Sequence, residues 1–285
     1  MFLEGSQGLK LAADVFGPEG GPPALLLHGM GQTRQSWGQA GAQLGAQGWR
    51  AYAIDLRGHG DSDWPAAYAY DNDDLAADVL ALCRQLGTPL LVGASMGGVC
   101  ALAAQGTSEQ QLFKGMVLVD IAPDVDMEGG RRIVNFMSAK PEGYADLDEA
   151  AEAIGAYRGG GRKPSTPGLT RVLKQRDNGR WYWHWDPRIL EPRLGWLNDA
   201  DAAAEYGQMM RTTMVGGAER LTVPTLLVRG GSSDVVSVAA AQALKEIVPQ
   251  ARYVDVADAS HMVAGDRNDV FVDAILEFAA PLLAR

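Results

Sequence analysis

Short runs of apolar residues recur along the chain, and each run ends at a glycine or a polar turn. The apolar residues are consecutive rather than alternating, which is typical of strands that are buried on both faces of a parallel sheet. We expect such strands at Pro23–His28, Arg50–Leu56, Pro89–Ala94, Gly115–Ile121, Pro224–Arg229 and Ala251–Ala257. The opening segment Leu3–Phe16 alternates more loosely and predicts an antiparallel hairpin at one edge of the sheet.

Segments with helical character separate most of these strands. They lie at Ser36–Gln47, Asn72–Leu86, Met96–Gln105, Val238–Ile247 and Asn268–Leu283. Strands that alternate with helices form βαβ units, in which successive parallel strands are joined across the faces of one sheet. The sequence therefore predicts an α/β fold with a doubly wound, mostly parallel sheet.

The alternation stops between about Pro123 and Thr222. This region contains three helical segments and an aromatic run at residues 181–185, and a compact domain rarely holds so long a loop without structure. The helical segments are Asp146–Tyr157, Leu169–Lys174 and Asp199–Met214. We expect a core domain of residues 1–122 and 223–285, with a helical cap of residues 123–222 inserted after the fourth parallel strand, the sixth strand of the chain.

Composition narrows the class of protein. The 285 residues carry a formal net charge of −10, which disfavours a nucleic-acid binder because such proteins neutralise phosphates. The two cysteines are too few for a disulfide framework and suit a reducing cytoplasm. The first ten residues lack an apolar segment, so we expect no signal peptide, and the uncharged stretch Pro89–Thr107 is too interrupted by glycines to span a membrane.

The strongest chemical signal is the sequence Gly-Ala-Ser-Met-Gly at residues 93–97, between a predicted strand and a predicted helix. A serine at such a sharp turn is held above the sheet beside the free N–H groups of the helix N-terminus. Glycine at Gly93 and Gly97 removes the side chains that would crowd the turn. This context indicates that Ser95 is a nucleophile.

A serine nucleophile needs a base and an acid that orients the base. His261 follows the last predicted strand, and loops at the carboxyl ends of parallel strands gather at one edge of the sheet. Asp234 is the first acidic residue after the preceding strand, so the chain order is Ser, Asp, His. Asp120 and Asp124, after Gly115–Ile121, are alternative acids.

An oxyanion hole is expected in the sequence His-Gly-Met-Gly at residues 28–31, with backbone N–H groups of Met30 and Met96 as donors. The same loop lacks the third glycine of a dinucleotide-binding motif. The sequence contains no phosphate-binding loop of the G-x-x-x-x-G-K-[ST] type, no H-E-x-x-H motif and no cysteine cluster. We therefore expect no metal and no cofactor.

Together these motifs resemble those of the α/β-hydrolase superfamily, and the resemblance covers nearly the whole chain outside the cap. The motifs are residues 28–31, 55–62 and 93–98 with Asp234 and His261. The resemblance is strongest to a bacterial group of carboxylesterases, lactonases, C–C bond hydrolases and cofactor-free perhydrolases. It implies the α/β-hydrolase fold, the triad Ser95–Asp234–His261, the donors Met30 and Met96, and a structural role for the turn that contains His59. Related epoxide hydrolases and haloalkane dehalogenases carry Asp at the position of Ser95, which argues against both activities.

The substrate pocket is less defined. Trp183 and Trp185 either cover the site or form the core of the cap, and Gly29 and Met262 are further candidates for substrate contact. Met30 and Met96 would add adaptable walls.

We expect a carboxylesterase-like hydrolase in the cytoplasm that cleaves small to medium apolar esters or lactones. Perhydrolysis, C–C bond hydrolysis and ligand reception without catalysis are the alternatives. The expected partner is the substrate, without nucleic acid or membrane, and a homodimer is one possible assembly.

Overall fold

A mixed sheet of eight strands forms the centre of the computed structural model, which describes residues 1–157, 166–257, 259 and 271–283. The strand order is β1-β2-β4-β3-β5-β6-β9-β10. The strands are β1 Phe2–Glu4, β2 Lys10–Phe16, β3 Pro23–Leu27, β4 Arg50–Ile54, β5 Leu90–Ala94, β6 Gly115–Val119, β9 Thr225–Gly230 and β10 Ala251–Val256. All neighbours from β4 to β10 are parallel, whereas β2 pairs antiparallel with both β1 and β4. Both the parallel sheet and the edge hairpin predicted from the sequence are confirmed.

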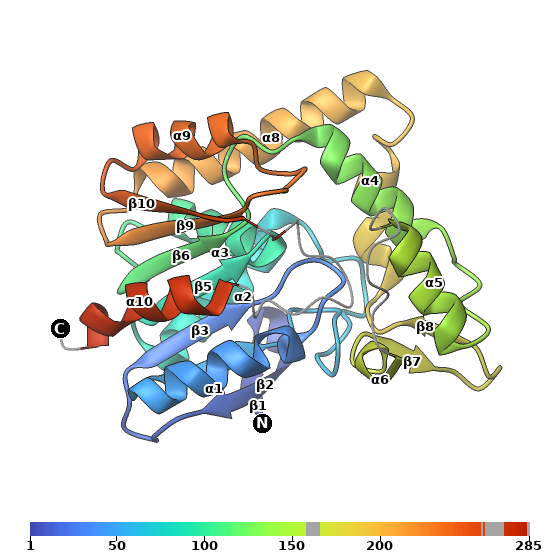
Figure 1. The fold of residues 1–285 in the computed structure, drawn as a ribbon, viewed down its shortest axis with the longest axis horizontal. Helices are drawn as coiled ribbons and strands as arrows, with labels where there is room; N and C mark the ends of the chain where they lie inside the picture. Colours follow the sequence, from blue (N-terminus) through green and yellow to red (C-terminus); the bar gives the residue numbers. More distant parts are fainter. Residues whose placement is uncertain (158–165, 258, 260–270, 284–285) are drawn as a thin grey trace.

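Helices cover both faces of the sheet (Figure 1). One face packs against α1 and α10, and the other against α2, α3 and α9. These helices are α1 Gly38–Gln47, α2 Asn72–Leu86, α3 Met96–Thr107, α9 Val238–Ile247 and α10 Val272–Leu283. Every residue of β5 and β6 is buried, as expected for strands that are apolar at consecutive positions. None of the described helices combines the length and apolar character needed to cross a membrane.

The chain between β6 and β9 folds into helices and a small hairpin, which we call the cap. It lies beyond the ends of the parallel strands in Figure 1. Its elements are α4 Met127–Ser138, α5 Leu147–Tyr157, α6 Thr166–Leu169, β7 Leu173–Gln175, β8 Trp181–Trp183, α7 Glu191–Leu194 and α8 Ala200–Glu219. The helices predicted at Asp146–Tyr157 and Asp199–Met214 are confirmed, and α4 is an additional helix whose N-cap is Asp126.

The helix predicted at Leu169–Lys174 is wrong, because this segment ends α6 and then begins β7. β7 pairs antiparallel with β8, the first half of the aromatic run. The connecting turn contains Asn178 and Gly179, and Gly179 has φ +78°, which favours glycine in a tight hairpin turn. Aromatic residues have high strand propensity, so the run recruits the preceding segment into a small hairpin.

The last helix of the cap is anchored on the core. α8 packs against α3 at Gly217, where an added Cβ would lie 2.0 Å from the carbonyl oxygen of Leu102. No side chain fits into that space, so glycine allows the two helix backbones to approach closely.

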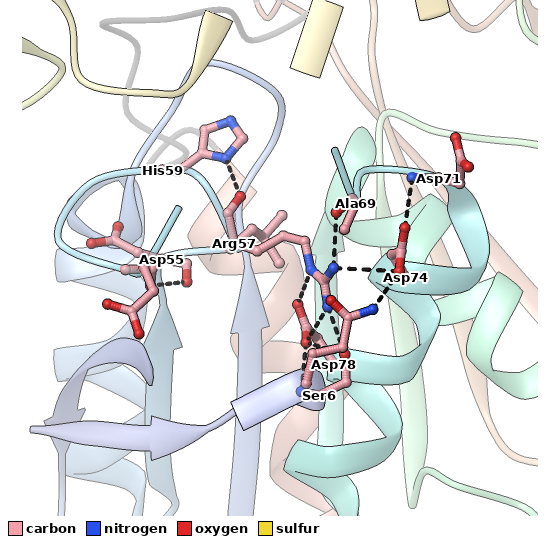
Figure 2. A network of polar contacts seen from close by, with 12 residues as sticks. Ser6, Asp55, Arg57, His59, Ala69, Asp71, Asp74 and Asp78 are labelled. Atoms are coloured by element: carbon pink, nitrogen blue, oxygen red, sulfur yellow. Dashed lines mark hydrogen bonds and ion pairs between the residues drawn. The ribbon is translucent and has the colours of Figure 1, made fainter. Parts of the chain in front are cut away.

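A buried polar network joins the edge hairpin to α2 (Figure 2). Arg57 is fully buried, and its guanidinium forms a bidentate ion pair with Asp78, from Nε to Oδ2 at 2.6 Å and from Nη2 to Oδ1 at 2.8 Å. Arg57 Nη2 also donates to Ser6 Oγ, and Nη1 donates to the carbonyl of Ala69. Each polar group here has a charged or carbonyl partner, which offsets the cost of removing it from water.

Candidate active site

Ser95 lies at the turn between β5 and α3 with φ +44° and ψ −115°, a conformation that non-glycine residues rarely adopt. Two glycines, Gly93 and Gly97, each two residues from Ser95, permit this turn. A Cβ on Gly93 would lie 2.7 Å from the backbone nitrogen of Gly98, and a Cβ on Gly97 would lie 2.4 Å from the carbonyl oxygen of Leu27. Steric strain at a single well-packed residue is typical of functional sites.

The loop after β3 lies directly beside Ser95. A Cβ built on Gly29 would be 3.4 Å from the Cβ of Ser95, which is van der Waals contact. The N–H of Gly29 is taken by the side chain of Gln32 at 3.0 Å. Neither the Met30 N–H nor the Met96 N–H donates to a protein group within the described part of the chain. Both methionines line the same cavity as Ser95.

Two buried histidines hold that loop in place. His28 Nε2 accepts from the Leu56 N–H at 3.1 Å, and His59 Nε2 accepts from the Gly31 N–H at 3.3 Å. In each ring Nδ1 therefore carries the proton and donates to a backbone carbonyl. Burial lowers the pKa of His28 to about 4 and that of His59 to about 3, so both rings are neutral at physiological pH. The structural role predicted for the His59 turn agrees with this arrangement.

A cavity of about 370 Å³ opens beside Ser95, between the core and the cap. The core wall is mainly apolar and includes Met30, Leu75, Met96, Val99 and Ile121. Helices α4 and α8 and the segment around α7 supply the opposite wall, which includes Met127, Ile133, Val134, Trp196, Tyr206 and Met210. A small concave site with apolar walls and a few polar groups is typical of small-molecule binding.

Within the described part of the chain, three charged side chains line this cavity: Asp124, Arg193 and Arg211. Asp124 and Arg211 form an ion pair with each other, and both are partly exposed. Arg193 is only 8% exposed and has no carboxylate partner among the described residues. Arg193 is not among the residues predicted from the sequence, although a lone arginine between Leu190 and Trp196 is a signal that could have revealed it.

The two leading acid candidates differ in their surroundings. Asp120 follows β6, is 2% exposed and has φ +49°. Its carboxylate accepts from the Gly230 N–H at 2.9 Å and from Ser233 Oγ at 2.7 Å. The side chain of Asp234 is 39% exposed, and Oδ2 accepts from Nη2 of Arg132, in α4, at 2.7 Å. Asp120 is thus a buried carboxylate between β6 and β9, whereas Asp234 faces a cap arginine.

The remaining site predictions have different outcomes. His261 and Met262 lie outside the described residues, and the chain before them is described as far as Ala259 with the exception of residue 258. Among the described residues that line the cavity, neither Trp183 nor Trp185 appears. The expected substrate contacts of Trp183 and Trp185 therefore stay predictions that the described lining of this cavity does not support.

Both tryptophans are instead buried within the cap and at its contact with the core, with exposed fractions of 8% for Trp183 and 3% for Trp185. The ring of Trp183 makes edge contacts with Phe136 and Tyr144, at centroid distances of 5.9 and 5.7 Å. The backbone of Trp185 pairs with that of His59. Trp183 and Trp185 therefore pack against other residues of the cap and the core and do not line the cavity.

The described residues contain no cluster of three or more histidine, cysteine, aspartate or glutamate side chains that could bind a metal ion. Both cysteines are buried, and burial raises the pKa of each thiol to about 12. Neither thiol is therefore ionised at neutral pH, so neither is suited to nucleophilic attack.

The fold and the turn at Ser95 together define the class of protein. A sequence profile of the alpha/beta hydrolase family matches residues 24–274, so the chain belongs to that family. A crystal structure of E-2-(acetamidomethylene)succinate hydrolase superposes on 98% of this chain and 97% of its own, with a TM-score of 0.74 at 22% identity.

Curated relatives cover most of the chain. A 2-(acetamidomethylene)succinate hydrolase of Mesorhizobium japonicum is 28% identical over 260 residues, which are 90% of this chain and 88% of the relative. An esterase of Mycobacterium tuberculosis is 28% identical over 270 residues, which are 89% of this chain and 81% of the relative. These relatives are hydrolases, and their names support hydrolytic activity for this chain.

Proposed function

We propose that this protein is a serine hydrolase that cleaves carboxylic esters through an acyl-enzyme intermediate. The observation that carries the proposal is the strained serine at the strand-to-helix turn. It opens onto an apolar cavity beside the backbone N–H groups of Met30 and Met96, neither of which donates to a described residue. A nucleophile, an oxyanion site and a pocket that excludes water are the parts that acyl transfer requires. The esterase name of one relative supports ester substrates.

In the proposed reaction, Ser95 Oγ attacks the ester carbonyl carbon while His261 takes the serine proton. The N–H groups of Met30 and Met96 bind the negative oxygen that develops on the carbonyl. The intermediate collapses, and the leaving alcohol receives the proton from His261. Water then attacks the acyl-enzyme by the same route and releases the carboxylic acid.

The assignment of His261 rests on the sequence, since it follows the strand β10 at the edge where Ser95 lies. The three histidines that the structure describes are each unsuited to act as the base, which favours His261. His28 and His59 are buried and neutral, and both of their ring nitrogens are engaged with the backbone. The pKa of His184 is lowered by burial, and this residue lies in the cap beside β8 rather than among the residues lining the cavity.

We propose Asp120 as the acid of the triad, in preference to Asp234. A triad acid is buried and holds the imidazole in one orientation, so it must itself be fixed. The two hydrogen bonds to Gly230 and Ser233 fix the Asp120 carboxylate beneath the loop after β9. The Asp234 carboxylate is exposed and engaged by Arg132, which is a weaker basis for that role.

The nucleophile is tested by replacing Ser95 with alanine. Ser95→Ala should fold as the parent does and lose about 10³–10⁶-fold in kcat on a short p-nitrophenyl ester. It should also lose labelling by a fluorophosphonate probe, which reacts with activated serines. Retention of activity within about tenfold of the parent would exclude the serine mechanism.

The acid is tested by two matched amide substitutions. Asp120→Asn should reduce kcat by about 10⁴-fold, because an amide favours the wrong histidine tautomer, whereas Asp234→Asn should cost much less. Thermal melting of both variants checks that each is folded. The opposite order of effects would assign the acid to Asp234.

A further inference from the structure

A charged group faces the proposed active-site cavity without a counter-ion among the described residues. Arg193, in α7, is 8% exposed and lines the cavity that contains Ser95. Its Nη1 donates to the carbonyl oxygen of Ile189 at 2.7 Å, and its guanidinium carbon lies 6.0 Å from the centroid of the Tyr206 ring. These contacts orient the guanidinium but leave its charge uncompensated, since neither partner is an anion.

The other buried arginines of the described chain each have a carboxylate. Arg57 pairs with Asp78 at 2.6 Å, and Arg229 pairs with Asp255 at 3.0 Å. For Arg193, no described carboxylate oxygen lies within the 4.0 Å that defines an ion pair. A guanidinium remains protonated at any physiological pH, and a buried charge without a partner is costly.

The other described residues of the cavity wall do not supply the missing charge. Asp124 is the one acidic residue among the described residues of the wall, and it is already paired with Arg211. The three charged side chains in the described part of the wall therefore sum to a single positive charge, which belongs to Arg193. The remaining wall is mainly apolar, so an anion that enters the cavity meets one strong binding group.

We propose that Arg193 binds a carboxylate of the substrate, and that this hydrolase prefers small esters bearing a carboxylate at a distance from the scissile bond. The planar guanidinium has five N–H donors and matches a carboxylate in a bidentate arrangement. Apolar walls on both sides would contact the hydrocarbon spacer between the two ends of such a substrate. This inference deepens the proposed function, on which its substrate preference rests.

The preference is tested with two p-nitrophenyl esters of similar size, the hemiglutarate and the pentanoate. The parent protein should have the higher kcat/KM on the hemiglutarate. Arg193→Met should lower kcat/KM on the hemiglutarate by about 100-fold or more, because the site then offers no partner for the carboxylate, and should change the pentanoate by no more than about threefold. Arg193→Lys should retain part of the preference, since lysine keeps the charge but not the bidentate geometry.

A control variant removes the same charge elsewhere. Arg252 is exposed, pairs with Glu277 and does not line this cavity. Arg252→Met should leave the ratio of the two kcat/KM values unchanged. A parent preference for the pentanoate, or an equal loss on both esters in Arg193→Met, would overturn the proposal and reduce Arg193 to a structural role in the cap.

Binding without turnover separates this inference from the proposed function. Glutarate should bind the Ser95→Ala protein in calorimetry and should no longer do so after the further change Arg193→Met. If no ester is hydrolysed by the parent but glutarate still binds through Arg193, the proposed reaction fails and the carboxylate site stands. If glutarate does not bind the Ser95→Ala protein, the carboxylate site fails whatever the esterase result.

Discussion

Two buried arginines, Arg57 in the core and Arg193 in the cap, differ in how their charges are matched. In the core, the guanidinium of Arg57 is surrounded by Asp78, Ser6 and the Ala69 carbonyl, so its charge is matched within the protein (Figure 2). In the cap, Arg193 has a backbone carbonyl and an aromatic ring but no described carboxylate. The first arrangement stabilises a structure, and the second suits a site that a ligand completes.

The largest loss of stability is expected when the partner of Arg57 is removed. Asp78→Ala should lower the free energy of unfolding by about 3–5 kcal/mol, since it leaves a buried charge unpaired. Urea denaturation followed by circular dichroism measures this change. Asp74→Ala is the control, because the Asp74 carboxylate lies 3.6 Å from Arg57 and is 21% exposed. It also accepts from the Asp71 N–H at the start of α2, so its loss should cost about 1 kcal/mol, well below the cost of Asp78→Ala.

A second pair of substitutions distinguishes residues that form the core of the cap from residues that line the cavity. Trp183→Ala should lower the free energy of unfolding by about 3 kcal/mol, because the ring is buried against Phe136 and Tyr144 and is absent from the cavity wall. The order of preference among esters of different acyl length should remain as in the parent. Met210→Ala, which enlarges the cavity, should instead shift that order towards longer acyl chains. If Trp183→Ala shifts the order and Met210→Ala does not, the side chain of Trp183 contacts the substrate.

Acid should weaken the core through histidines that are buried without charge. The pKa values of His28 and His59 are lowered to about 4 and about 3, so below about pH 6.5 the unfolded chain binds more protons than the folded one. The free energy of unfolding should therefore fall as the pH decreases from about 6.5 towards 4, by at most about 1.4 kcal/mol per pH unit for each histidine.

Chemical denaturation at several pH values measures that slope. His59→Gln keeps an acceptor for the Gly31 N–H but does not titrate, so it should flatten the acid part of the curve. An unchanged slope in this variant would exclude His59 as a source of the acid sensitivity.

The smallest effect is expected for the arginine of the cap. Arg193→Met should change the free energy of unfolding by less than about 1 kcal/mol, in either direction, because removing an unmatched buried charge offsets the lost contacts with Ile189 and Tyr206. Thermal melting beside the Asp78→Ala variant makes the comparison direct. A loss as large as that of Asp78→Ala would mean that Arg193 supports the cap fold.

Much of the core could be predicted because its signals are local. A strand that is buried on both faces must be apolar throughout, and β3, β5 and β6 are. The turn at Ser95 is likewise encoded by two glycines within five residues. The hairpin of β7 and β8 escaped prediction because each strand has only three residues and one contains exposed Lys174 and Gln175.

The acid and the cap side of the cavity depend on contacts between distant segments. Arg132 and Asp234 are 102 positions apart in the sequence, and their ion pair turns Asp234 towards the cap. Asp120 is fixed by Ser233, from a loop 113 positions later. The strand order brings both aspartates to the same edge, so the sequence left the choice between them open.

The glycine contact between α8 and α3 has a mechanical consequence. The C-terminal part of α8 is fixed on the core at Gly217, whereas its earlier part supplies Tyr206 and Met210 to the cavity wall. Because α8 is fixed near Gly217, a movement of α8 that widens the cavity would have to occur in its N-terminal part. Leu102 belongs to α3, which begins just after Ser95. A side chain at position 217 would therefore displace α8 and α3 together.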